Sequence, residues 1–315
     1  MLHAVDRLEI LVVVDNYADT LLGSSPGVAR FRIGEDGRLA SDTLLAEHGL
    51  CLLLRAEWDG QRVSVMLDAG YSPIAAPRNL DLMGETTNEL SGLVISHGHE
   101  DHVGAALSVL ERAGRPPLVA HPGAFHVPRY WSADDGTLYR VPELLRRDDL
   151  ERRGIRIIES LEPTEIGGGA FLVTGEIPRA TSFEQALPGS IQEVDGELVP
   201  DKISDDQAVI VDVRGHGLVV ISGCAHAGIV NTVHHARKLT GMRPVYAVVG
   251  GFHLSGAPFR DSIEPTIEAL REEHPSRIVP MHCTGVDAMT RMRHTLGDVC
   301  AVSAVGTRFS FPFQR

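Results

Sequence analysis

Three histidines and two acidic residues crowd into the short stretch ISHGHEDHVG, residues 95–104. Imidazole nitrogens and carboxylate oxygens are ligands that zinc, iron and manganese take in proteins. His97 and His99 stand two residues apart, so an extended chain can direct both toward the same point. Asp101 and His102 follow at the start of a helical pattern. A polar helix start would explain one acid but not three histidines, so the stretch predicts a metal site.

The elements that must position this cluster are a strand before it and a helix after it. The apolar run Gly92–Ser96 predicts the strand, and apolar spacing of three or four residues predicts a helix over Val103–Ala113. Further strands are expected at Leu8–Val14, Leu50–Arg55, Val63–Leu67, Ile155–Ile158, Phe171–Thr174, Ala208–Val213, Leu218–Ser222, Val245–Val249 and Ile278–Met281. Further helices are expected at Ile229–Thr240, Ser262–Glu273 and Asp287–Leu296. This alternation is typical of a layered α/β protein.

The sheets are expected to be mixed. Gly215 and Gly217 stand in the turn between the two apolar runs of AVIVDVRGHGLVVISG, which predicts a hairpin of antiparallel strands. The whole chain, residues 1–315, is interpreted as one domain. The segment 123–149, which contains Trp131 and a charged helical pattern, is the best candidate for a lid or an insertion.

Composition restricts the functions open to the chain. Its 315 residues are 43% hydrophobic and 23% charged, a globular balance. A formal net charge of -13 disfavours nucleic acid and anionic membranes as partners, so an anionic substrate must be captured locally. Four cysteines at unpaired spacings argue against a disulfide framework. We expect no membrane segment and no signal peptide, and therefore a cytoplasmic protein. No feature of the sequence indicates an oligomeric state.

The motif HGHEDH resembles the HxHxDH signature of the metallo-β-lactamase superfamily. The stretch VSVMLDAG resembles the strand that ends in Asp-x-Gly in that superfamily and carries Asp68, while LVVISGCAHAG and IVPMHCTG resemble its later ligand segments. GEIPRATSFE and VVGGFHLSGA extend the similarity to the branch of 7,8-dihydropterin-6-methyl-4-(β-D-ribofuranosyl)-aminobenzene-5′-phosphate synthase-like metallohydrolases. The resemblance implies an αββα sandwich with metal ions at one sheet edge.

The same resemblance assigns ligands residue by residue. It implies that His97 and His99 serve one metal ion, and that Asp101, His102 and His282 serve a second. Asp101 would also be catalytic by orienting water. The expected cofactor is one or two divalent ions, most readily zinc, with iron or manganese as alternatives.

Two segments depart from the superfamily pattern. A bridging Asp is usual where this chain has SGCAH, so Cys224 and His226 compete for that position; His226 is the favoured ligand and Cys224 a further candidate. Where another histidine is usual, LVTGEIPR offers Glu176, which could bind metal or pair with Arg179.

Other residues near these motifs are assigned secondary roles. His253 and Arg179 are candidates for contacts with substrate, and Asp68 and Asp206 are candidates to orient ligating imidazoles. A structural role is expected for the two histidines of the presumed lid, His121 and His126.

The function expected from the resemblance is a metal-dependent hydrolase, or a dihydropterin-type transferase, acting on a small phosphate-bearing substrate. Metal-activated water or metal-assisted departure of phosphate or pyrophosphate would drive the reaction. The alternative is a non-catalytic metal-binding sensor or scaffold. A nuclease is disfavoured by the charge of -13, and an oxygen-reducing di-iron enzyme by the lack of room for a flavin domain.

Overall fold

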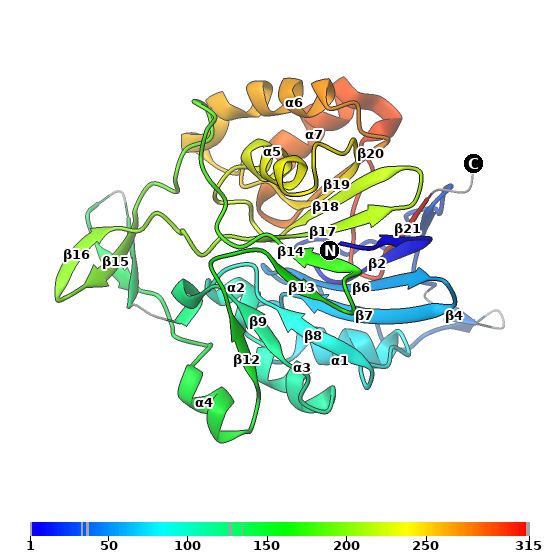
Figure 1. The fold of residues 1–315 in the computed structure, drawn as a ribbon, viewed down its shortest axis with the longest axis horizontal. Helices are drawn as coiled ribbons and strands as arrows, with labels where there is room; N and C mark the ends of the chain where they lie inside the picture. Colours follow the sequence, from blue (N-terminus) through cyan, green and yellow to red (C-terminus); the bar gives the residue numbers. More distant parts are fainter. Residues whose placement is uncertain (1, 33, 36–37, 126–127, 134, 313–315) are drawn as a thin grey trace.

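Two mixed β-sheets pack face to face, and helices cover the outer face of each (Figure 1). The computed structural model describes residues 2–32, 34–35, 38–125, 128–133 and 135–312. The αββα sandwich expected from the sequence is confirmed.

The first sheet contains the strand that leads to the HGHEDH motif. Its order is β12 (Ile157–Glu159), β9 (Leu118–Ala120), β8 (Leu90–Val94), β7 (Gln61–Leu67), β6 (Cys51–Trp58), β2 (Arg7–Val14), β21 (Arg308–Phe311) and β3 (Val28–Ala29). On its outer side lie α1 (Ala75–Leu82), α2 (Glu100–Val103), α3 (Ala106–Arg112) and α4 (Arg147–Arg152). Val109 and Leu110 of α3 pack with Leu93 in a buried cluster on this side.

The second sheet supplies the later candidate ligands. Its order is β13 (Thr164–Ile166), β14 (Phe171–Val173), β17 (Ala208–Val213), β18 (Gly217–Ser222), β19 (Val245–Gly251) and β20 (Arg277–Met281), with β1 (Ala4–Val5) paired to β17. Its outer face is covered by α5 (Ile229–Leu239), α6 (Ile263–Glu272) and α7 (Val286–Leu296). The expected antiparallel hairpin is present as β17 and β18.

The core between the sheets is aliphatic and aromatic. Ile10, Leu52, Phe171, Val211 and Phe309 are fully buried there. Each such side chain contributes about 1.5–3 kcal/mol on burial, so the facing sheets form a rigid base for the loops at their edges.

A third, smaller sheet stands apart from the sandwich, where Figure 1 labels β15 and β16. Its order is β11 (Leu138–Arg140), β10 (Arg129–Ser132), β15 (Ser190–Val194) and β16 (Glu197–Pro200). The segment 123–149 thus contributes a hairpin that pairs with a later part of the chain, a pairing that local sequence pattern does not reveal. A two-stranded ribbon, β4 (Gly34–Glu35) and β5 (Arg38–Leu39), completes the sheets.

The helix expected at Val103–Ala113 differs from the observed one. It begins earlier, as α2, and breaks at Gly104 before α3 starts. The N–H of Gly104 donates to the carbonyl of Gly70 at 2.8 Å, and a Cβ at Gly104 would collide with the backbone of Tyr71. The break therefore comes from tertiary contact. No helix in the described ranges combines the length and apolar character needed to cross a membrane.

Candidate metal centre

The chemistry-bearing residues lie where strands of the two sheets end. Strands β7 and β8 run parallel, as do β18, β19 and β20, so their carboxyl ends meet at common edges. Asp68, Ala225, His253 and His282 follow four of these ends with φ between 45° and 60°. Left-handed backbone is uncommon for such residues and concentrates at functional sites.

One set of candidate ligands consists only of imidazoles. His97, His99 and His226 each offer a nitrogen, and these atoms lie within 4.8 Å of one another. The ring centroid of His226 lies 4.7 Å from that of His97 and 4.8 Å from that of His99. We call these three residues the tri-imidazole group. His226 therefore does not take the position of a bridging Asp but completes the set begun by His97 and His99.

A second set combines oxygen, nitrogen and sulfur donors. Asp101, His102, Cys224 and His282 also place ligand atoms within 4.8 Å of one another. Oδ2 of Asp101 is 3.2 Å from Nε2 of His282, and Sγ of Cys224 is 3.1 Å from Nε2 of His102. We call these four residues the mixed group. Of these two groups, Cys224 therefore belongs to the mixed group and His226 to the tri-imidazole group.

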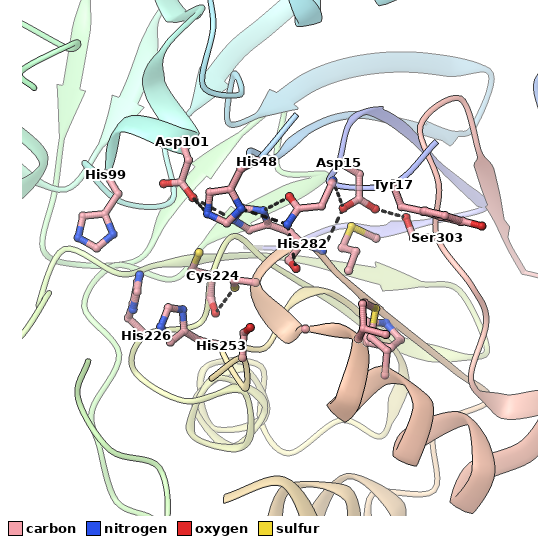
Figure 2. Close-up of a pocket in the computed structure, with 18 of the residues that line it drawn as sticks. Asp15, Tyr17, His48, His99, Asp101, Cys224, His226, His253, His282 and Ser303 are labelled. Atoms are coloured by element: carbon pink, nitrogen blue, oxygen red, sulfur yellow. Dashed lines mark hydrogen bonds and ion pairs between the residues drawn. The ribbon is translucent and has the colours of Figure 1, made fainter. Parts of the chain in front are cut away.

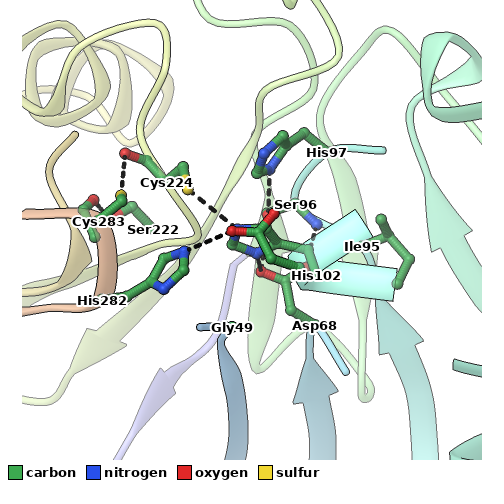
Figure 3. A network of polar contacts seen from close by, with 12 residues as sticks. Gly49, Asp68, Ile95, Ser96, His97, His102, Ser222, Cys224, His282 and Cys283 are labelled. Carbon is green, nitrogen blue, oxygen red and sulfur yellow. Dashed lines mark hydrogen bonds and ion pairs between the residues drawn. The ribbon is translucent and has the colours of Figure 1, made fainter. Parts of the chain in front are cut away.

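A buried carboxylate fixes the orientation of His102 (Figure 3). Asp68 accepts from the N–H and hydroxyl of Ser96 at 2.7 and 2.8 Å, and its Oδ2 lies 2.7 Å from Nδ1 of His102. An Nδ1–H donated to Asp68 leaves Nε2 of His102 free to face the mixed group, the arrangement that supports ligating histidines. Gly223 allows this network to form, because a Cβ there would collide with the hydroxyl of Ser96.

Burial and neighbouring charge keep the tri-imidazole group neutral. Burial, together with nearby imidazoles, holds the pKa of His97 and that of His226 well below the ordinary value. Burial beside Arg129 lowers the pKa of His99 to about 3. Neutral imidazoles have a free lone pair, so the three rings are in the protonation state that binds metal.

In the mixed group, neighbouring charges favour the charged forms of Asp101 and His102, in contrast to the neutral imidazoles of the tri-imidazole group. Burial tends to raise the pKa of Asp101, but His102 and His282 outweigh it and hold that pKa below the ordinary value. Burial likewise opposes the charge on His102, yet Asp101 and Asp68 raise its pKa to about 9. Burial raises the pKa of the Cys224 thiol, so this thiol needs a nearby cation to become a thiolate.

Unpartnered buried nitrogens show that both groups fit metal ions. Nε2 of His97 and both ring nitrogens of His226 are buried without a hydrogen-bond partner, and the buried Nε2 of His282 lies 3.2 Å from the carboxylate of Asp101, itself a candidate ligand. A buried polar atom without a partner is costly and needs an explanation. Divalent metal ions in the two groups would satisfy these atoms.

His253 lies beside both groups. Its ring centroid is 4.2 Å from that of His226, and it forms a further set of neighbouring donor atoms with Cys224 and His226. It lines the central cavity, where contact with substrate can occur.

Three other sequence candidates lie elsewhere. Glu176 is exposed and is not part of these donor groups within the described residues. Arg179 does not line the cavity; its guanidinium donates to the carbonyls of His226 and Lys202 at 2.8 and 2.7 Å. Asp206 accepts from the N–H of Ala227 at 2.8 Å, so it supports the loop backbone and not an imidazole.

His121, one of the two histidines for which a structural role is expected, is not part of the donor groups among the described residues. His121 is buried and its Nδ1 accepts from the N–H of Gly123 at 3.0 Å, a local structural contact. His126 lies outside the described residues.

Sequence reasoning missed His48 and Asn16. Nε2 of His48 lies 3.5 Å from Oδ2 of Asp101, and Oδ1 of Asn16 lies 2.9 Å from Nδ1 of His282. Each is an isolated polar residue in a loop, without a motif, and only tertiary structure brings it to the centre. Figure 2 shows His48 there, beside Asp101 and His282.

Both groups open onto a cavity of about 910 Å³. Its walls include His99, Asp101, Cys224, His226 and His282 (Figure 2). Two arginines also line it. Arg129 is buried and paired with Asp201 and Asp205, while the exposed Arg293 has no carboxylate partner in the part of the chain that the structure describes. A cavity of this size holds a molecule larger than a simple phosphate ester.

An αββα sandwich with such donors at one edge defines a class of metal-dependent proteins. The model of the metallo-β-lactamase superfamily matches residues 46–239, more than half of the chain, so the chain belongs to this superfamily.

Two relatives from Methanocaldococcus jannaschii are similar in sequence over most of their length. The chain is 29% identical over 276 residues to a 7,8-dihydropterin-6-methyl-4-(β-D-ribofuranosyl)-aminobenzene-5′-phosphate synthase, covering 85% of this chain and 91% of the relative. It is 32% identical over 249 residues to an uncharacterized protein, covering 78% and 88%.

Solved structures support the fold. A crystal structure of a metal-dependent hydrolase of the β-lactamase superfamily matches with a TM-score of 0.70 at 22% identity, covering 96% of this chain and 98% of the other. A diphosphatase of the PhnP family matches with a TM-score of 0.50 at 11% identity, covering 97% of each chain.

Proposed function

We propose that the chain is a metal-dependent hydrolase, or a dihydropterin-type transferase, that acts on a small phosphate-bearing substrate. The observation that carries this proposal is the pair of adjacent donor groups opening onto one cavity. The similarity to a pterin-pathway synthase supports the transferase form, and the superfamily supports the hydrolase form.

Zinc is the proposed metal. The tri-imidazole group offers only nitrogen, and the mixed group offers a thiol, two imidazoles and one carboxylate. Thiolate and imidazole suit zinc better than they suit magnesium, calcium or manganese, and iron is the closest alternative. We propose two ions, one for each group.

The groups differ in the coordination positions that they leave open. Three protein ligands leave a position for water or substrate, whereas four protein ligands can close a tetrahedral site. A divalent ion at such a centre polarises a phosphate oxygen and lowers the pKa of water. The tri-imidazole group is therefore the proposed place of reaction.

Residues of the chain then hold the reacting groups. Asp101 lines the cavity and directs its carboxylate toward His282 and His48. There the carboxylate can accept a hydrogen bond from a water molecule and orient it. Asp68 keeps His102 in the matching tautomer. Since the chain is acidic and Arg129 is already paired, the phosphate would find its positive partners at this centre and at Arg293, which lines the same cavity. The same charge of -13 supports a small-molecule partner and not nucleic acid or a membrane.

A non-catalytic metal-binding sensor or scaffold is the second candidate. Four protein donors in the mixed group match the ligand number of structural zinc sites. The open tri-imidazole group beside a large cavity favours the enzyme.

The test is a screen of phosphomonoesters, phosphodiesters and pyrophosphate compounds with zinc-loaded protein, with and without an amine acceptor. We expect turnover that is lost after chelation and restored by zinc. His99→Ala should abolish it, while His294→Ala, a change at an exposed histidine of α7, should not. Full turnover by chelated, metal-free protein would contradict the proposal, and zinc binding without turnover of any compound would favour the sensor.

A further inference from the structure

The small third sheet presents aromatic side chains on the face toward the cavity. Trp131 of β10 lines the cavity and is 42% exposed. Tyr139 of β11 stands directly opposite it across the strand pair and is 58% exposed. Ser190, which pairs with Trp131 on the other side, also lines the cavity. Directly paired residues share one face of a sheet, so the side chains of Trp131 and Tyr139 project from the same face at neighbouring positions.

This aromatic surface is tied to the HGHEDH loop. Side chains two apart in a strand share a face, so Arg129 lies on the same face as Trp131, about 7 Å along the strand. Arg129 is buried and donates to Asp201 and Asp205 at 2.9 and 2.7 Å. Asp205 in turn accepts from the N–H of Gly98 at 2.8 Å. Buried, charge-assisted bonds thus hold β10 in a set position relative to the donor groups.

Packing of the protein interior does not account for the placement of Trp131. The other tryptophan, Trp58, is 8% exposed and belongs to the core between the sheets. A single exposed apolar side chain is common on protein surfaces. An exposed tryptophan at the wall of a cavity that also contains metal-type donors, with a tyrosine paired beside it, is a different situation, since aromatic faces bind flat rings by stacking.

We infer that Trp131 is a specificity-determining residue that stacks on a planar aromatic or heteroaromatic ring of the substrate, with Tyr139 extending the stacking surface. The substrate class is then a phosphate ester or anhydride whose other end is such a ring. The inference rests on the proposed function for the phosphate end only. Val141 and Leu187 line the same wall and provide an apolar surround for the ring.

The experiment compares two probes that differ by one ring system. Guanosine 5′-monophosphate and ribose 5-phosphate share a sugar phosphate, and only the first has a flat heterocycle. Calorimetric titration of zinc-loaded protein should give tighter binding of the nucleotide. Trp131→Ala should weaken nucleotide binding about 10- to 100-fold and leave ribose 5-phosphate binding unchanged, and Trp131→Phe should retain most of it because a ring remains.

Fluorescence and a matched control complete the test. The chain has two tryptophans, so nucleotide-dependent quenching should disappear in Trp131→Phe, where only Trp58 remains. Leu198→Ala changes an exposed apolar residue on the opposite face of the same sheet and should not alter binding.

The outcomes separate this inference from the proposed function. Equal binding of both probes, or equal losses in Trp131→Ala and Leu198→Ala, would overturn the role of Trp131. Ring-dependent binding through Trp131 without turnover of any phosphate compound would support the inference and contradict the proposed function alone.

Discussion

The tri-imidazole and mixed groups stand side by side but are constructed differently. His97, His99 and His226 are uncharged and present buried nitrogens, some of them without partners. The mixed group is already connected internally: Asp101 contacts His282, and His102 contacts both Asp68 and Cys224. The tri-imidazole group therefore has few polar contacts with other protein groups, and the mixed group has several.

This difference indicates that the two groups have different roles. The Asp101 carboxylate, and the Cys224 thiolate that a bound cation would produce, would bring negative charge to the mixed group and strengthen its hold on that cation. Three neutral imidazoles leave their ion more positive and one coordination position open. We therefore expect the mixed group to retain metal more firmly and the tri-imidazole group to dominate turnover.

The largest effect is expected when both groups are damaged together. His97→Ala combined with His102→Ala removes one ligand from each group and should abolish metal binding. Lewis-acid stabilisation is worth several kcal/mol, so turnover should fall by about a thousandfold or more. Elemental analysis and activity assays measure both, and circular dichroism should show a retained fold because His97 lies in a loop and His102 in the short helix α2, both outside the sheets. Full metal content in this double variant would refute the assignment of the HGHEDH motif.

Single changes in the two groups should separate occupancy from turnover. His226→Ala and Cys224→Ser are each expected to reduce bound metal to about one ion per chain, because each removes a ligand from one group only. His226→Ala should cost about a hundredfold in kcat, and Cys224→Ser about tenfold, since the mixed group is the more remote from reaction. Cys51→Ser, at a buried thiol of β6, is the control for loss of a cysteine. The reverse order of kcat losses would assign the reaction to the mixed group.

Asp68, which contacts Nδ1 of His102, should affect metal affinity in the mixed group only. Asp68→Asn weakens the contact that orients His102 and should lower metal affinity of the mixed group about 10- to 100-fold. Competition with a chromophoric chelator measures this change. Asp212→Asn, at a buried carboxylate paired with Arg243, should leave affinity unchanged. Equal losses in both variants would show a general effect of removing buried charge.

The buried carboxyl group of Asp206, which accepts a hydrogen bond from the N–H of Ala227, is expected to make protein stability depend on pH. Burial raises the pKa of Asp206 from 3.8 to about 7 in the folded chain. Protonated Asp206 therefore contributes to the free energy of unfolding. This contribution is fully present below pH 3.8 and is lost as the pH rises through 7. Asp206→Asn lacks this titration, so its melting temperature relative to the parent protein should increase between pH 5 and pH 8 in metal-free protein. A difference that stays constant over this range would show that Asp206 is ionised throughout.

The sequence contained enough information for the fold and for much of the donor set. The HGHEDH motif is local, and its strand and turn can be recognised from residues 92–104. Segments ending in His226 and His282 were recognisable because apolar strands precede them. The grouping of His226 with His97 and His99 was not recognisable, since it depends on how β18 places its end opposite β8. Glu176 was proposed from its position in the chain, and only the folded structure shows that it is exposed and not part of the donor groups among the described residues.

Contacts between distant parts of the chain explain what sequence patterns missed. Asn16 and His282 are separated by 266 residues and meet because β2 and β20 belong to facing sheets. The hairpin of β10 and β11 pairs with β15 across about 50 intervening residues, and neither partner has a long apolar run. Gly104 interrupts a helical pattern because of its contact with Tyr71, which periodicity does not contain.

Cobalt substitution tests the central claim of two unlike metal sites most directly. Metal-free protein titrated with cobalt(II) should bind two equivalents per chain, and only one of them should produce a thiolate-to-cobalt charge-transfer band, because Cys224 is part of the mixed group and not of the tri-imidazole group. Cys224→Ser should lose the band, while His226→Ala should keep it with one equivalent bound. A single equivalent in the parent protein, or a band that survives in Cys224→Ser, would contradict the account.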